Sequence, residues 1–507
     1  EKKRMQLTLI QSKLLDKNDV FQQLFKAVSN FSQERYAALH PMIFEQDIPT
    51  IQLHIAEGKF TYEDLTLYYL KRIYTYELDP EKTLHTIIAL NPDVLGQARS
   101  RDKFRKKAMK HPIFGMPILL KDNINMTQMP ATAGAAIMTG VESSNNAFIV
   151  SKLIDNGALI LGKVNLSEWA YYFCSGCPVG YSAVGGQTLN PYGRGVFETG
   201  GSSAGSGTSI AANYAVAAVG TETAGSILSP SAQNSIVGLK PTIGILSRSG
   251  IVPISHTLDT PGPMTKNVID NAILLDAMAG RDFDDDATKP KMTSYFIEGK
   301  NENLQGKRLG VIKDLMNNTI YAETIKKLEA NGATLVPLDL PEKSLNGFMT
   351  LLNLEMKDDL PKYIREYTRS SNKITSVQDI IAFNLKDSVL LMPYGQGRLE
   401  GIMADTTAIE VFEKIRQTLL IDGNAYFQEP MVTNTLDAIL SINNYHAAFA
   451  AVGLHPCLAL PMGYEPSGEP IAITLISSPN SEKELLALGY SIENTLNARI
   501  TPLDYVD

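Results

Sequence analysis

The sequence has few cysteines, no long apolar run and no excess of basic charge, and each shortage excludes a class of protein. Among its 507 residues are three cysteines, a small odd number that argues against a disulfide-stapled scaffold. No run of 18 apolar residues occurs, and the longest small-apolar stretch, 210–219, is interrupted by Asn213, so no transmembrane helix is predicted. The formal net charge is −8, and without a basic stripe the chain lacks the electrostatic pattern of a nucleic-acid-binding protein.

The cysteines are Cys174, Cys177 and Cys457, and the first two form a C-x-x-C pair. A structural zinc site needs four ligands of matching type, and the sequence has no second C-x-x-C or H-x-x-H pair to complete one. We therefore expect a plain structural role for Cys174 and Cys177, and no metal.

The sequence begins at Glu1 with the charged stretch EKKRMQLTLIQSKLL, which lacks an adequate apolar segment for a signal peptide. We expect a cytoplasmic protein, and secretion after removal of an upstream signal stays open as the alternative.

Alternation of helical and strand-like segments indicates an α/β fold. The stretch 60–78 has apolar residues at helical spacing and an N-terminal capping pair, Thr61 and Asp64. A buried strand is predicted at 84–90, followed by a polar helix over 94–110. The pattern then predicts a strand at 115–124, a helix from 146 to Gly157 and a strand at 158–164, and we expect a mainly parallel sheet.

The composition also predicts a division of the chain. Residues 1–75 are expected to form an N-terminal helical segment, and 76–507 a single domain whose C-terminal part, 290–507, is more variable. The stretch 176–263 is dense in Gly, Ser, Thr and Ala and poor in charge, and it lies within a core motif region at 110–285. There a Gly/Ser loop is predicted to open into a helix over 209–220.

The sequence contains only a weak match to a familiar serine-hydrolase motif. The stretch GSSAG (201–205) fits G-x-S-x-G with Ser203 in the middle, but no convincing strand precedes it. The histidines that follow, His256, His446 and His455, have no telling context, and we expect each to be structural.

A longer pattern is more specific. The stretches GMPILLKDNI (115–124), GGSSAGSG (200–207) and GTETAGSILSPS (220–231) occur in this order, and 24 positions separate Ser202 from Ser226. Together they resemble the amidase signature family, whose pattern is a lysine after an apolar strand, a G-G-S-S loop and a G-x-[DE]-x-x-G-S-I loop. The resemblance implies the amidase signature fold, a large twisted mixed β-sheet covered by helices on both faces.

The resemblance assigns Ser226 as nucleophile, Ser202 as proton relay and Lys121 as base. A serine hydroxyl needs a base to take its proton, and a lysine can serve only when burial keeps it neutral. A surface lysine paired with Asp122 is the alternative for Lys121. The resemblance further implies a cis peptide between Gly201 and Ser202, with Gly201 and Ser203 in supporting roles.

The same resemblance places the oxyanion hole in the turn before the nucleophile. Its expected donors are the N–H groups of Thr223, Ala224, Gly225 and Ser226, which can converge on one developing negative charge. Two residues depart from the family pattern. Ala224 tolerates the turn only with a negative φ, and Leu228 stands where many members have Arg, which puts recognition of a carboxylate substrate in doubt.

The resemblance implies hydrolysis of a carboxylic amide, either a non-peptide amide or the C-terminal amide of a peptide, without a metal or organic cofactor. The pattern favours a stand-alone bacterial amidase similar to peptide amidase. The alternatives are a glutamine amidotransferase A-type subunit that supplies ammonia within a complex, and an inactive binding scaffold. We expect a small-molecule or peptide amide as partner and no nucleic acid, leave the oligomeric state open between monomer and homodimer, and expect loops within 127–178 and 300–450 to build the substrate pockets.

Overall fold

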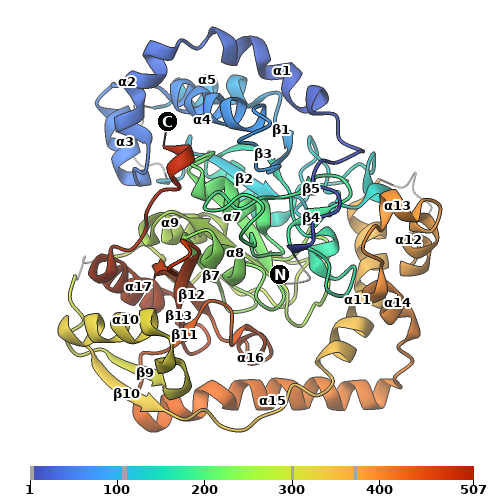
Figure 1. The fold of residues 1–507 in the computed structure, drawn as a ribbon, viewed down its shortest axis with the longest axis vertical. Helices are drawn as coiled ribbons and strands as arrows, with labels where there is room; N and C mark the ends of the chain where they lie inside the picture. The colour runs from blue at the N-terminus through green and yellow to red at the C-terminus, as the bar shows by residue number, and fades with distance from the viewer. Residues whose placement is uncertain (1–4, 106–110, 299–301, 370–373, 507) are drawn as a thin grey trace.

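The computed structural model describes residues 5–105, 111–298, 302–369 and 374–506, which fold around one large sheet (Figure 1). The sheet has eleven strands in the order β1-β3-β2-β6-β8-β7-β12-β13-β11-β9-β10. They are Ile87–Leu90 (β1), Pro117–Lys121 (β2), Leu159–Val164 (β3), Ala217–Glu222 (β6), Val237–Lys240 (β7), Thr260–Thr265 (β8), Arg308–Ile312 (β9), Thr334–Leu338 (β10), Ala438–Ile442 (β11), Cys457–Tyr464 (β12) and Pro470–Ile476 (β13). A separate ribbon pairs Tyr181–Ser182 (β4) with Gly186–Gln187 (β5).

The sheet is mixed, which confirms the predicted fold class, but the expectation of a mainly parallel sheet is wrong. Of the ten neighbouring strand pairs, four are parallel and six are antiparallel. The reason is clearest at β12 and β13, because only residues 465–469 connect them and so short a connection can join only antiparallel neighbours.

Helices cover both faces of the sheet, as the alternation along β12 shows. Leu458 lies against Gly489 of α17, whereas Cys457 and Ala459 share an apolar cluster with Leu228 of α8. Since successive strand residues face opposite sides, α8 and α17 cover opposite faces. The helices packed around the sheet are α5 (Val94–Asp102), α6 (Phe148–Asp155), α7 (Ala204–Ala211), α8 (Leu228–Gln233), α9 (Val268–Met278), α10 (Thr319–Ala330), α16 (Ala447–Val452) and α17 (Glu482–Leu496).

A second group of helices lies to one side, at the right and bottom of Figure 1. It supplies much of a separate apolar cluster that includes Leu351, Met356 and Leu360. The group consists of α11 (Phe348–Tyr367), α12 (Val377–Asn384), α13 (Ser388–Leu391), α14 (Gly397–Ala404) and α15 (Ile409–Asn434). Short 3₁₀ turns occur at Ala136–Met138, Glu168–Tyr171, Lys313–Asn317 and Leu503–Tyr505. No helix in the described ranges is long and apolar enough to cross a membrane.

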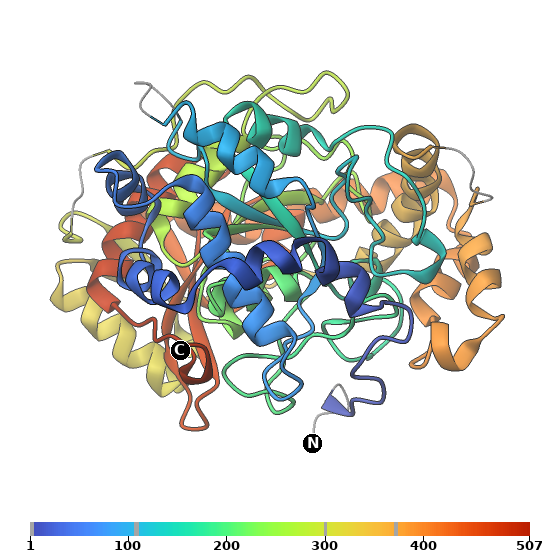
Figure 2. The same cartoon turned by 90° about the horizontal axis from the view of Figure 1, so that it is seen from above.

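The N-terminal region contains four helices, Lys17–Asn30 (α1), Gln33–Ile43 (α2), Ile48–Ala56 (α3) and Tyr62–Glu77 (α4). Thr61 and Asp64 form the predicted capping box at the start of α4. Residues 5–16 contain no α-helix, contrary to the prediction for 1–75, because their backbone docks on the β4–β5 ribbon, where the Gln187 N–H donates to the Ile10 carbonyl at 2.8 Å. Figure 2 shows this segment running from the N-terminus along the outside of the molecule.

Two helices end at other residues than the sequence predicted. The helix expected over 94–110 stops at Asp102, and residues 106–110 lie outside the described part of the chain. The helix expected over 209–220 is instead α7, which ends at Ala211, followed by Asn213 with φ 57° and then by strand β6. The alanine-rich run has a high helix propensity, but pairing with β2 and β8 in the middle of the sheet outweighs it.

Candidate active site

Two neighbouring parallel strands, β2 and β6, bring their carboxyl ends to the same edge of the sheet. Lys121 is the last residue of β2 and is fully buried. Its Nζ donates to Ser202 Oγ at 2.7 Å, to Thr221 Oγ1 at 2.8 Å and to the Thr221 carbonyl at 3.1 Å. Burial lowers the pKa of Lys121 to about 7, although the carboxylates of Asp259 and Glu222 act to raise it. This lysine can therefore be neutral close to neutral pH.

Asp122 does not pair with Lys121. Successive residues of a strand face opposite sides, and the Asp122 carboxylate lies 3.1 Å from Lys163 Nζ of the neighbouring strand β3. Both members of that pair are buried. The alternative of a surface lysine paired with Asp122 is therefore excluded for Lys121.

The loop before α7 carries Ser202. The Gly201–Ser202 peptide bond is cis, as the family resemblance implies. A Cβ added at Gly201 would come within 2.5 Å of Val179 Cγ1 and 2.7 Å of Ser167 Oγ, so only glycine fits there. The Ser167 N–H donates to the Ser202 carbonyl at 3.0 Å, which fixes the loop from the other side.

Ser203, the central serine of the G-x-S-x-G match, ties this loop to β6. Its Oγ donates to the Thr221 carbonyl at 3.0 Å and accepts from the Thr221 N–H at 3.2 Å. Its own N–H donates to the Ser226 carbonyl at 3.2 Å, so the two serine loops lie side by side.

The turn that carries Ser226 is organised by the buried carboxylate of Glu222 at the end of β6. This carboxylate accepts from the N–H groups of Gly225, Ile227 and Leu228 at 2.6, 2.6 and 2.9 Å. Gly225 has φ 103°, a conformation that favours glycine, while Ala224 lies outside that region, as its expected role requires.

The same contacts distinguish the four expected oxyanion-hole donors. The Gly225 N–H is already donated to Glu222, whereas the described residues offer no acceptor for the N–H groups of Thr223, Ala224 and Ser226. Leu228, the departure from the family pattern, is buried at the start of α8.

The sequence of residues 64–451 matches the family named Amidase. That range is more than half of the chain. The chain belongs to the amidase family.

This amidase is 34% identical over 500 residues to a protein named "Probable amidase" from Arabidopsis thaliana, covering 95% of this chain and 96% of that protein. It is 29% identical over 478 residues to the A-type subunit of a glutamyl-tRNA(Gln) amidotransferase from Lawsonia intracellularis, covering 87% and 95%. Among solved structures, an amidase family protein from Bacillus anthracis superposes with a TM-score of 0.92 at 34% identity, over 98% of this chain and 100% of that one. The native peptide amidase from Stenotrophomonas maltophilia superposes with 0.85 at 34% identity, over 90% and 98%. The activity class of the chain is thus amide hydrolysis.

A pocket in this amidase opens beside Thr221 and Thr223. Its walls come from the loop 248–261 and from the end of α11, including Tyr363 and Tyr367. Helix α11 lies within the predicted range 300–450, but the loop 248–261 was not expected to line a pocket. The signal that could have found it is the stretch HTLDTPGPM (256–264), which extends the family resemblance and overlaps the second half of this loop.

The three histidines that follow the G-x-S-x-G match in the sequence lie in structural settings. His455 is buried, with Nδ1 2.8 Å from the Ser477 carbonyl and Nε2 3.2 Å from the Asn424 carbonyl. His446 Nδ1 lies 2.6 Å from Ser441 Oγ. His256 is exposed and lies between Glu355 and Asp359 of α11.

His256, Glu355 and Asp359 offer ligand atoms within 4.8 Å of one another, which is a geometry that a metal ion could use. However, both oxygens of Glu355 already accept hydrogen bonds from the loop, from Ser255 Oγ, Thr257 N–H and Thr257 Oγ1. We therefore assign the cluster to holding the loop against α11.

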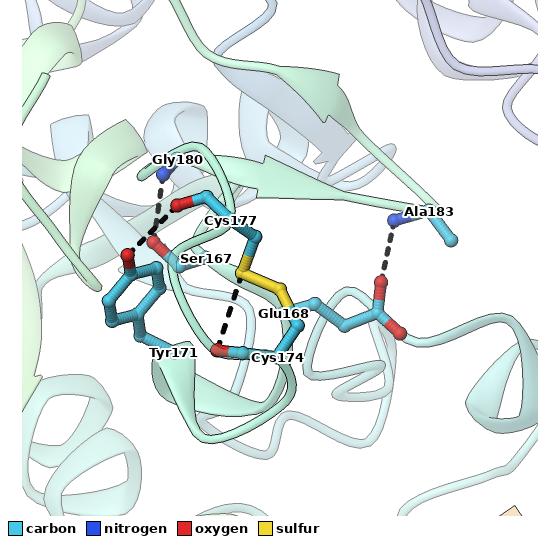
Figure 3. The surroundings of a disulfide bond; sticks show 7 residues. All are labelled: Ser167, Glu168, Tyr171, Cys174, Cys177, Gly180 and Ala183. Atoms are coloured by element: carbon cyan, nitrogen blue, oxygen red, sulfur yellow. Dashed lines mark hydrogen bonds between the residues drawn. A yellow bond between two sulfur atoms is a disulfide. The ribbon is translucent and has the colours of Figure 1, made fainter. Parts of the chain in front are cut away.

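Cys174 and Cys177 form a disulfide bond, a pairing that the sequence did not predict (Figure 3). It lies in the segment 167–180, whose ends touch the Ser202 loop through Ser167 and Val179. Tyr171 Oη donates to the Cys177 carbonyl at 2.8 Å, and Ser167 Oγ accepts from the Gly180 N–H at 2.8 Å. The disulfide bond therefore stabilises the segment 167–180, which packs on Gly201.

Proposed function

We propose that this amidase hydrolyses carboxylic amides through an acyl-enzyme on Ser226, with Ser202 as proton relay and Lys121 as base. The observation that carries the proposal is the 2.7 Å contact between the buried Lys121 Nζ and Ser202 Oγ. A lysine whose pKa lies near 7 can accept a proton through this hydroxyl at the pH of a typical cell interior.

The reaction proceeds in two halves. Ser226 Oγ attacks the amide carbonyl carbon while its proton passes through Ser202 Oγ to Lys121 Nζ. The protonated lysine then returns a proton, by the same path, to the leaving amine nitrogen as the C–N bond breaks. A water molecule next attacks the ester carbonyl carbon and loses its proton to the same relay. The relay returns this proton to Ser226 Oγ as the ester C–O bond breaks and the carboxylic acid leaves.

The negative charge that develops on the carbonyl oxygen needs preorganised donors. Of the expected set, Thr223, Ala224 and Ser226 have N–H groups without an acceptor among the described residues, so we assign them the main role. Gly225 contributes chiefly its conformation, since its N–H is held by Glu222. The Glu222 carboxylate thereby holds the turn 223–226 in place.

The substrate class that we propose is a non-peptide amide or the C-terminal amide of a peptide. It is supported by the 34% identity, over 90% of this chain, to a peptide amidase of known structure. The alternative is an A-type amidotransferase component, favoured by the 29% identity to such a protein. Buried Leu228 stands against it, because a leucine cannot bind a substrate carboxylate as an arginine can. Hydrolysis of amidated peptides and aryl amides by the isolated chain separates the two functions.

The decisive experiment is covalent labelling with a fluorophosphonate. We expect one label per chain, located on Ser226 by peptide mass spectrometry, together with loss of turnover. Ser226→Ala should lose both labelling and activity, with an unchanged melting temperature. Stoichiometric labelling of the Ser226→Ala protein would contradict the assignment.

A further inference from the structure

Asp259 lies at the edge of the pocket, one residue before β8, and its carboxylate is held by three hydrogen bonds. One oxygen accepts from Thr223 Oγ1 at 2.6 Å. The other accepts from the N–H groups of Ile254 and Ser255 at 2.8 and 2.9 Å. The proposed acyl-enzyme mechanism uses none of these contacts.

The contact with Thr223 reaches the catalytic turn. Thr223 directly follows Glu222 and begins the turn 223–226, whose N–H groups are the proposed oxyanion donors. Its hydroxyl points to Asp259 and its side chain is nearly buried, so the carboxylate limits how the first peptide of the turn can rotate. Glu222 holds the other half of the turn through Gly225, Ile227 and Leu228.

The segment that carries Asp259 is itself fixed to α11. Glu355 accepts hydrogen bonds from Ser255 and Thr257, and Asp359 accepts from the His256 N–H at 2.8 Å. Asp259 is therefore presented to Thr223 from an anchored segment.

Asp259 also acts on the base through its charge. Burial raises the pKa of Asp259 to about 6, so the carboxylate is ionised in the range where Lys121 loses its proton. The charged groups that interact with Lys121 are Asp259 and Glu222, and both favour its protonated form. Asp359 and Arg248 in turn interact with Asp259, from α11 and from the loop 248–261.

We propose that Asp259 is a positioning residue for amide hydrolysis, which orients the oxyanion turn through the Thr223 hydroxyl and sets the charge environment of Lys121. This inference rests on the proposed function, in which Ser226 is the nucleophile and Lys121 is the base. It assigns Asp259 two separable effects, one geometric and one electrostatic.

The electrostatic effect is tested by the pH profile of kcat/KM. In Asp259→Asn the negative charge is gone, the pKa of Lys121 falls further, and the rising limb should move to lower pH by about 0.5 to 1 pH unit. The matched control is Asp285→Asn, another carboxylate at the same pocket, which pairs with Arg248 at 2.6 Å. In the Asp285→Asn control, kcat/KM should rise over the same pH range as in the wild type. A folded Asp259→Asn enzyme with an unmoved limb would overturn the electrostatic part.

The geometric effect is tested at Thr223, where the charge of Asp259 is left in place. Thr223→Val removes the hydroxyl at nearly equal volume and should lower kcat about 10- to 100-fold, with KM and the pH limb nearly unchanged. Thr223→Ser keeps the hydroxyl and should restore most of kcat. Wild-type kcat in Thr223→Val, or no recovery in Thr223→Ser, would overturn the geometric part. This test stands even if Asp259→Asn fails to fold.

Failure of the proposed function gives a different result. In that case the Lys121→Ala variant keeps substantial activity and its kcat/KM rises with pH as in the wild type, or the fluorophosphonate labels a residue other than Ser226. If Lys121→Ala is inactive and Ser226 is labelled, unchanged behaviour of the Asp259 and Thr223 variants counts against the role of Asp259 alone.

Discussion

Lys121 must lose its charge before it can accept a proton, and its surroundings decide at what pH this happens. The side chain is fully buried at the end of β2, and desolvation disfavours the ammonium form. Two carboxylates oppose this effect without cancelling it. The result is a lysine poised near neutrality, with its hydrogen bonds directed to Ser202 and Thr221.

This environment predicts the pH dependence of the enzyme. Because burial lowers the pKa of Lys121 to about 7, the neutral base accumulates as the pH rises through 7. We expect kcat/KM to increase through this range and to reach a plateau on the alkaline side. Steady-state rates between pH 5 and 10 check the prediction, with Lys121→Ala as the variant that should lose the limb and most of the rate. A rise of kcat/KM centred near the ordinary lysine pKa would contradict the prediction.

We predict that replacing the adjacent serines Ser202 and Ser203 lowers kcat to very different extents. Ser202→Ala removes the hydroxyl that contacts Lys121, so kcat should fall by about 10³-fold or more. Ser203→Ala removes two hydrogen bonds to the Thr221 backbone and should cost about 1–3 kcal/mol of stability, with a much smaller loss of kcat. Steady-state kinetics and urea unfolding of both variants distinguish the roles. An inactive Ser203→Ala beside a near-normal Ser202→Ala would reverse them.

At the scale of elements, the segment 167–180 supports the catalytic loop from outside. The Cys174–Cys177 disulfide closes a short loop within it, and Ser167 and Val179 carry the contacts with Gly201 and Ser202. These contacts are made by backbone and side-chain atoms that remain when the disulfide is reduced. Stability should therefore respond to reduction more than the chemistry does.

Reduction of this disulfide should lower the free energy of unfolding by about 2 kcal/mol, the chain-entropy value for so short a loop. Urea unfolding with and without a dithiol reductant measures the difference. The matched control is the double variant Cys174→Ser, Cys177→Ser, which should show the lower stability in both conditions, while kcat changes less than about threefold. Identical unfolding curves for the wild type with and without reductant would contradict the prediction.

At the scale of the whole molecule, the C-terminal tail lies beside the N-terminal helices (Figure 1). Arg499 pairs with Glu45, which follows α2, at 2.7 Å, and also donates to the Ser235 carbonyl at 2.8 Å. Arg72 of α4 donates to the carbonyls of Tyr505 and Asn213. The contacts of Glu45 with Arg499 and of Arg72 with Tyr505 join segments more than 400 positions apart in the sequence.

Glu45→Gln should lower the free energy of unfolding by about 2 kcal/mol at pH 7, because it leaves the largely buried Arg499 without its counter-charge. Burial acts to raise the pKa of Glu45, but Arg499 lowers it to about 2. A carboxylate with a depressed pKa contributes stability above its unfolded value of 4.5 and loses that contribution as the pH falls towards 2. The difference between variant and wild type should therefore shrink below pH 4.5.

Urea unfolding at pH 7 and at pH 3.5 checks this prediction, and Glu413→Gln serves as the control. Glu413 pairs with Arg416 within α15, where both side chains are partly exposed, and such a pair near the surface contributes little. A difference for Glu45→Gln that stays constant down to pH 3 would contradict it.

The fold shows where reasoning from the sequence reaches its limit. Alternating segments predicted an α/β protein, and the capping box of Thr61 and Asp64 located one end of α4 within a residue or two. The strand β6 was misread as helix, because a short run of small apolar residues has no distinguishing period. The directions of the strands were misjudged for a similar reason, since pairing depends on which segments meet.

The active site divides in the same way. The sequence by itself determined which lysine and which two serines to propose, through the resemblance of three ordered motifs to the amidase signature family, and the proposed chemistry requires those residue types. Only the tertiary structure decided that Asp122 pairs with Lys163, that Glu222 occupies the Gly225 N–H, and that Asp259 contacts Thr223. The reason is physical: a local pattern records the type of each residue, whereas burial and hydrogen-bond partners are set by segments that are distant in the chain and meet only when the sheet forms.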